Sequence, residues 1–113
     1  MTYDLIILRG GPAGTAAGIY ASRKRLKTVL ITCEFGGQSV VSEDIQNWIG
    51  TVSITGKDLA ENLKKHLSAY AGDVVDIVEG EKIKKLEKKE EGFRAVTENG
   101  KEYNGKNVLI ASG

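Results

Sequence analysis

The residues best suited to hold a ligand stand in a glycine-rich turn close to the start of the chain. Gly11, Pro12, Ala13 and Gly14 follow an apolar run at residues 5–8 and begin a segment of small residues that extends to Ala21. Glycine lets the backbone turn sharply and approach a ligand closely, and proline suits a first helical turn. A helix that begins here points free N–H groups and its positive end at whatever lies over the turn. The natural occupant of such a turn is a diphosphate.

The elements on either side of the turn support this interpretation. The apolar run before it and the segment Lys27 to Thr32 are typical of strands buried on both faces of a parallel sheet. Glu34 stands 20 residues after Gly14, about where a dinucleotide fold places the acid that binds a ribose hydroxyl. Strand, turn, helix and strand together predict a βαβ unit that binds a nucleotide. The alternative is a βαβ unit whose glycines serve only packing.

One residue departs from the dinucleotide pattern. When Gly14 is the last glycine of G-x-G-x-x-G, Gly11 is the middle one and Arg9 occupies the first position. Glycine is used at that position for the tight turn. We therefore expect the long side chain of Arg9 to strain or tilt the loop.

Length and composition limit the remaining classes of function. A chain of 113 residues with 16 basic and 15 acidic side chains has a net charge of +1, which favours neither nucleic acid nor an anionic membrane as partner. Its apolar runs are too short to span a membrane, and no signal sequence opens it, so we expect a cytoplasmic protein. Cys33 is the single cysteine and is expected to be a small packing residue. No metal site is predicted.

The second half of the chain predicts a long helix and further strands. Gly56 to Ala71 carries an apolar stripe, with Thr55 as its N-cap and Gly72 as its end; the stripe is Leu59, Leu63, Leu67 and Tyr70. His66 is expected to be partly exposed. For the connection before the helix, one interpretation is that Ile45, Trp48 and Ile49 cap the core; this is compatible with a ligand-binding role for the same stretch.

Two further parallel strands and a meander are expected after this helix. Val74 to Val78 is predicted as a third parallel strand and Asn107 to Ala111 as the last. Between them, residues 93–98, a hairpin turn at Asn99-Gly100 and residues 101–103 predict a small antiparallel meander, with the charged residues before it on a solvated face.

Five motifs together resemble the first part of the FAD domain in low-molecular-weight thioredoxin reductases. They are RGGPAG at 9–14, EFGGQ at 34–38, IQNWIG at 45–50, TGKDL at 55–59 and VLIASG at 108–113. The resemblance implies an α/β, Rossmann-like three-layer FAD/NAD(P)-binding fold, with a parallel sheet, helices and an antiparallel β-meander at about 81–104. Residues 1–113 would form a single, partial FAD-binding domain. In that family a nicotinamide-nucleotide domain is inserted after a segment ending in A-T-G, and Ala111-Ser112-Gly113 corresponds to that junction.

The resemblance also implies a set of cofactor-binding residues. Gly11, Pro12, Ala13, Gly14 and Gly113 would lie at the diphosphate of FAD and Glu34 at a ribose. The residues near the flavin would be Gly36, Gly37, Gln38 and Asn47, and Trp48 would form part of the pocket wall. The backbone near Gly80 and Glu81 would lie beside the adenine. No residue here is a credible catalytic acid, base or nucleophile. The redox C-x-x-C of the family belongs to the inserted domain and has no counterpart in this chain.

Two functions of different classes follow. The favoured one is the FAD-binding portion of a thioredoxin reductase-like oxidoreductase, which in its complete form moves electrons from NAD(P)H to a disulfide or another acceptor. The alternative is a structural module that binds nucleotide weakly or not at all and self-associates, as Arg9 and the missing remainder of the domain would favour. A small nucleotide-binding module is a third interpretation, supported by the βαβ pattern alone. Whether the chain is itself an enzyme stays open, and a homodimer or larger assembly is expected.

Overall fold

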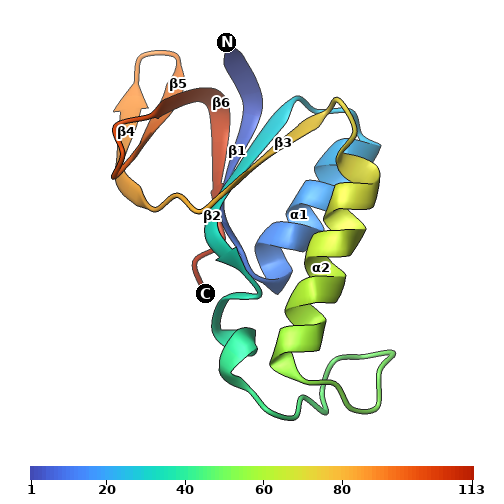
Figure 1. Ribbon diagram of the computed structural model, residues 1–113. Helices are drawn as coiled ribbons and strands as arrows, with labels where there is room; N and C mark the ends of the chain where they lie inside the picture. The colour runs from blue at the N-terminus through green and yellow to red at the C-terminus, as the bar shows by residue number, and fades with distance from the viewer.

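Six strands form a single sheet in the computed structural model, which describes residues 1–113, and two α-helices lie together on one side of that sheet (Figure 1). A short 3-10 helix, η1, joins the second strand to the loop before the second helix (Figure 1). The elements in chain order are β1 (Thr2–Gly10), α1 (Pro12–Arg23), β2 (Thr28–Phe35), η1 (Gly37–Val41), α2 (Gly56–Ala71), β3 (Val75–Glu79), β4 (Ile83–Lys89), β5 (Gly92–Thr97) and β6 (Glu102–Ile110).

The sheet combines a parallel part with an antiparallel part. Its strand order is β3-β2-β1-β6-β5-β4, in which β3, β2, β1 and β6 run parallel while β5 is antiparallel to both β4 and β6. The β4-β5-β6 meander turns away from the helices and forms a third layer (Figure 1). This arrangement confirms the predicted Rossmann-like α/β fold with a small meander.

The last strand differs from the prediction. Residues 101–103 and 107–111 were expected as two strands, but β6 is continuous from Glu102 to Ile110. Gly105 pairs with Phe93 of β5 and with Tyr3 of β1, and a Cβ added to it would lie 2.6 Å from Cγ1 of Ile6. This glycine therefore marks a close approach between strands and does not interrupt β6.

Both faces of the parallel strands are buried, which explains their continuous apolar sequences. Toward the helices the core consists of Ile7, Leu30, Phe35, Leu67, Ala71, Val74 and Val75. Toward the meander it consists of Tyr3, Ile6, Leu8, Val29, Ile31 and Ala95. On this second face the hydroxyl of Tyr3 donates a hydrogen bond of 2.6 Å to Oδ2 of Asp76. The pKa of Tyr3 is raised, mainly because the hydroxyl is buried and also because it makes this bond.

The two helices pack closely because α1 presents glycine to α2. A Cβ at Gly18 would lie 2.9 Å from Cδ1 of Leu67. Helix α2 begins as predicted, with the hydroxyl of Thr55 accepting a hydrogen bond from the amide of Asp58, and ends at Gly72, whose φ is +50°. Neither helix combines the length and the apolar composition needed to cross a lipid bilayer.

Two predictions about apolar side chains are wrong. Tyr70 is 55% exposed, and the stripe of α2 continues instead through Ala71, four residues after Leu67, which is buried in the same cluster as Val74. In the connection before α2, Ile49 is 94% exposed and does not cap the core. The backbone across that connection is joined by the isolated bridge between Ile45 and Ile54 and by a hydrogen bond of 2.8 Å from the amide of Gly56 to the carbonyl of Ser42.

Candidate functional site

The glycine turn joins the carboxyl end of β1 to the first residue of α1. The amide of Gly10 donates to Oγ1 of Thr32 at 3.1 Å, and the amide of Gly36 donates to the carbonyl of Gly10 at 2.9 Å, so the turn is tied to β2 and to the loop after it. Gly11 caps α1 without a side-chain partner, and the amide of Thr15 donates to the carbonyl of Gly11 at 2.9 Å, so the amides of Ala13 and Gly14 precede this bond in the first turn of the helix. The turn therefore presents free donors at a positive helix end.

Gly14 and Arg9 fix the shape of this turn. A Cβ at Gly14 would lie 1.9 Å from the carbonyl oxygen of Arg9, so helix α1 contacts the end of β1 only because residue 14 is glycine. Arg9 has a φ of +87°, a left-handed conformation that suits glycine. This value confirms the predicted strain, which costs about 1–3 kcal/mol for a residue with a Cβ.

A cavity of about 330 Å³, here called the turn cavity, opens over the glycine turn. Gly11 faces it with free space, since an added Cβ would meet no atom closer than the Cα of Gly37 at 3.8 Å. The amides of Gly37 and Gln38 begin η1, ahead of the amide of Ser39, which donates to the carbonyl of Gly36 at 3.1 Å. The residues lining the cavity are Arg9, Gly11, Pro12, Ala13, Gly37, Gln38, Ser39, Ile110, Ala111, Ser112 and Gly113.

A larger cavity of about 650 Å³, here called the strand-end cavity, adjoins the first and shares Arg9, Gly37 and Gln38 with it. Its other walls come from the end of β2, from η1, from the β3–β4 connection and from the end of β5. The remaining lining residues are Ile31, Cys33, Glu34, Val41, Glu81, Lys82, Ile83 and Glu98.

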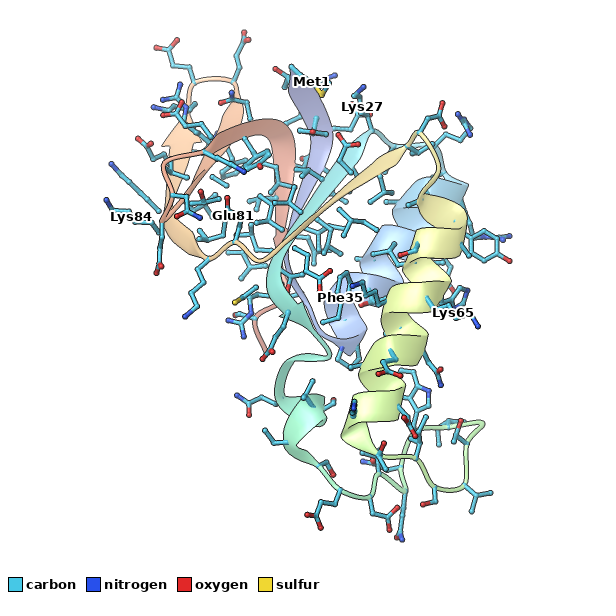
Figure 2. The ribbon with its side chains drawn as sticks, viewed as in Figure 1. Met1, Lys27, Phe35, Lys65, Glu81 and Lys84 are labelled. Atoms are coloured by element: carbon cyan, nitrogen blue, oxygen red, sulfur yellow. The ribbon has the colours of Figure 1, made fainter.

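Glu81 is the buried carboxylate of the strand-end cavity. Only 6% of the residue is exposed; Nδ2 of Asn99 donates to its Oε2 at 2.5 Å, and Nζ of Lys101 lies 3.4 Å from its Oε1. The amide of Glu98 donates to the carbonyl of Lys82 at 2.9 Å. Glu81 lies on the meander side of the sheet, whereas Phe35 lies between sheet and helices (Figure 2). These bonds hold the β3–β4 connection against the hairpin turn and so fix one wall of the cavity.

Most of the predicted site residues come together around the two cavities. Gly11, Pro12, Ala13 and Gly113 line the turn cavity, Glu34 and Glu81 line the strand-end cavity, and Gly37 and Gln38 line both.

Four other predicted residues line neither cavity. Gly14 and Gly36 are buried beneath the site, where Gly36, with a φ of +94°, leaves no room for a Cβ beside Ala60. Asn47 is exposed in the loop before α2, and Gly80 turns the chain after β3 with a φ of +88°.

Sequence reasoning missed three side chains of the strand-end cavity and misplaced one of them. Cys33 was expected to pack in the interior but is exposed and faces this cavity, because β2 continues to Phe35 while its pairing with β3 stops at Thr32. Lys82 and Glu98 were not assigned to the site. Their signal was available, since Lys82 directly follows the predicted site residue Glu81 and Glu98 is the last residue of the expected strand 93–98.

Comparison with known proteins agrees with this geometry. A family model described as pyridine nucleotide-disulphide oxidoreductase matches residues 3–113. The NADH dehydrogenase of Bacillus subtilis and one subunit of the alkyl hydroperoxide reductase of Staphylococcus aureus are each 35% identical to the chain over 111 residues. That alignment covers 98% of this chain but 21% of either relative, so the chain spans about a fifth of their length.

Solved structures of thioredoxin reductases share the fold over almost the whole chain. The enzyme of Lactococcus lactis superposes with a TM-score of 0.90 at 28% identity, covering 99% of this chain and 36% of its own. The enzyme of Streptococcus pyogenes gives a TM-score of 0.88 at 32% identity, with coverages of 99% and 35%.

Proposed function

Because the chain belongs to the pyridine nucleotide-disulphide oxidoreductase family, we propose that it is the FAD-binding portion of a thioredoxin reductase-like oxidoreductase. The family implies a flavin and a pyridine nucleotide; the choice of FAD as the ligand of this chain is our proposal. The activity of a complete enzyme, from NAD(P)H to a disulfide or another acceptor, is proposed on the same ground. The cytoplasmic location expected from the sequence stays a prediction.

The observation that carries this proposal is the pair of adjoining cavities. They extend from the free amides at the start of α1 to the carboxylate of Glu34 and share the backbone of Gly37 and Gln38. Free amides at a helix start suit a diphosphate, and an acid after the second strand suits a ribose hydroxyl. The donors, the open space over Gly11 and the acid therefore fit a dinucleotide.

Each residue group has a binding role in this proposal. The amides of Ala13 and Gly14 would donate to phosphate oxygens, Glu34 would accept from a ribose, and the backbone at Gly80 and Glu81 would lie beside the adenine. Gln38 and Asn47 would contact the flavin side. When bound, the flavin supplies hydride and electron transfer, while the protein supplies orientation and electrostatics.

Retention of FAD by the purified chain tests the proposal. The protein is mixed with excess FAD, desalted and examined by visible absorption, and any released ligand is identified by mass spectrometry. Retained flavin bands, with FAD as the released ligand, are the expected result. A folded but colourless protein would instead favour the structural module that binds no nucleotide.

A further inference from the structure

Arg9 is held in its strained conformation from two sides. Its carbonyl oxygen lies where a Cβ of Gly14 would stand, and the preceding carbonyl, that of Leu8, accepts a hydrogen bond of 3.0 Å from the amide of Ala111. Helix α1 and the segment after β6 thus enforce a φ of +87° on a residue that carries a side chain. Strain that the surrounding structure enforces is typical of ligand sites.

The side chain of Arg9 reaches both cavities and has no partner within the chain. It lines the turn cavity and the strand-end cavity, is exposed, and takes part in no ion pair or side-chain hydrogen bond. Arg9 is the one charged residue among the three, with Gly37 and Gln38, that the two cavities share.

The charges around the cavities favour an anion beside Arg9. Three carboxylates, those of Glu34, Glu81 and Glu98, line the strand-end cavity, where Lys82 is the one basic side chain besides Arg9. Arg9 is the only charged side chain that lines the turn cavity. Without its charge, a diphosphate would meet backbone amides and the helix end but no cationic side chain in the turn cavity, and it would approach a wall in which negative charge exceeds positive charge.

We propose that Arg9 is a ligand-binding residue whose guanidinium contacts the diphosphate of a dinucleotide lying across the two cavities, and that it does not obstruct the site. This inference rests on the proposed FAD binding. Guanidinium forms paired, charge-assisted hydrogen bonds with phosphate oxygens and keeps its charge at all physiological pH values. Arg9 stands where the dinucleotide pattern has its first glycine, and the contact of its guanidinium with the diphosphate compensates for the strain that the missing glycine causes.

Three variants separate charge from bulk at this position. R9Q keeps a long side chain at the strained φ but loses the charge, R9K keeps the charge without the paired donors, and R9G removes the side chain and the strain. Affinities for FAD and for ADP are measured by titration at low and at high salt. Riboflavin, which has no phosphate, serves as the control ligand.

The expected result is a loss of about tenfold or more in affinity for FAD and ADP in R9Q and R9G, with a smaller loss in R9K. The salt dependence of FAD binding falls in both neutral variants, and riboflavin binding is unchanged. R9G also melts at a higher temperature than the wild type, because its strain is relieved.

Two results would contradict the role of Arg9 and leave the proposed FAD binding intact. If R9Q binds FAD as the wild type does, with the same salt dependence, Arg9 makes no contact with the diphosphate. If R9G binds FAD more tightly than the wild type, Arg9 obstructs the site. If none of the four proteins binds FAD while their circular dichroism shows them folded, the proposed function fails and this inference fails with it.

Discussion

At the scale of single residues, two glycines of one turn have different tasks. Gly14 lets α1 contact the carbonyl of Arg9, whereas Gly11 leaves free space over the turn cavity. G14A is therefore expected to destabilise the protein by about 2–3 kcal/mol, because the methyl group overlaps a backbone oxygen that cannot move away. Thermal or urea denaturation measures this loss.

G11A is the matched control three residues earlier. The φ of Gly11 is −74°, which alanine adopts without strain, so we expect the free energy of unfolding to stay within about 0.5 kcal/mol of the wild type. The added methyl stands between Gly11 and Gly37 in the turn cavity, and affinity for FAD should fall about tenfold. Equal stability losses in G11A and G14A would contradict this division of tasks.

The sequence predicted the residue types of the site better than their surroundings. The G-x-G-x-x-G spacing identified Gly11 and Gly14 and marked Arg9 as a strained substitution, since these conclusions depend on local backbone geometry. It did not place the side chain of Arg9 between two cavities or expose Cys33. The exposure of Cys33 depends on where strands β2 and β3 stop pairing, and the position of Arg9 depends on which segments surround the turn; both are tertiary properties.

At the scale of elements, helix α2 owes its position to one row of side chains at intervals of four. Leu59, Leu63, Leu67 and Ala71 are buried, and Leu67 is fully enclosed between α1 and the sheet. L67A should lower the free energy of unfolding by about 2–4 kcal/mol, because the cavity it leaves lies against the rigid backbone of Gly18. Chemical denaturation measures this change.

Tyr70 provides the control on the same helix. The expected stripe included it, but its ring is exposed and lies 5.4 Å from that of His66, centroid to centroid. Y70A should change the free energy of unfolding by less than about 1 kcal/mol. A loss in Y70A as large as that in L67A would show that the stripe includes Tyr70 after all.

The types of the helices and strands were predictable from the sequence, whereas the continuity of one strand was not. Periodicity and caps predicted α2 with its observed bounds, Gly56–Ala71. Strand β6 was predicted as two strands, at 101–103 and 107–111, whereas Gly105 between them lies within one strand and its contacts with Ile6 require glycine there. Only the pairing of β6 with β1 and β5 together distinguishes these cases.

At the scale of the whole molecule, the sheet has β3 and β4 as its edge strands and, besides them, an unpaired stretch of β6. Beyond Gly105, strand β6 pairs with β1 on one side only, since the pairing with β5 has ended. Leu109 and Ile110 in this stretch are 37% and 63% exposed. Unpaired strand edges with apolar side chains favour the addition of a further strand. The homodimer expected from the sequence, which stays a prediction, would use this edge.

Substitution of Ile110 by lysine tests that use of the edge. A charge on an edge strand opposes pairing, so I110K should be monomeric at concentrations where the wild type forms dimers, as measured by light scattering during size-exclusion chromatography. V52K is the control, because Val52 is 92% exposed in the loop before α2 and far from β6 in sequence. A wild type that stays monomeric, or dimers lost equally in V52K, would contradict assembly through this edge. Dimers lost only in I110K would mean that β6 completes its pairing with a second chain.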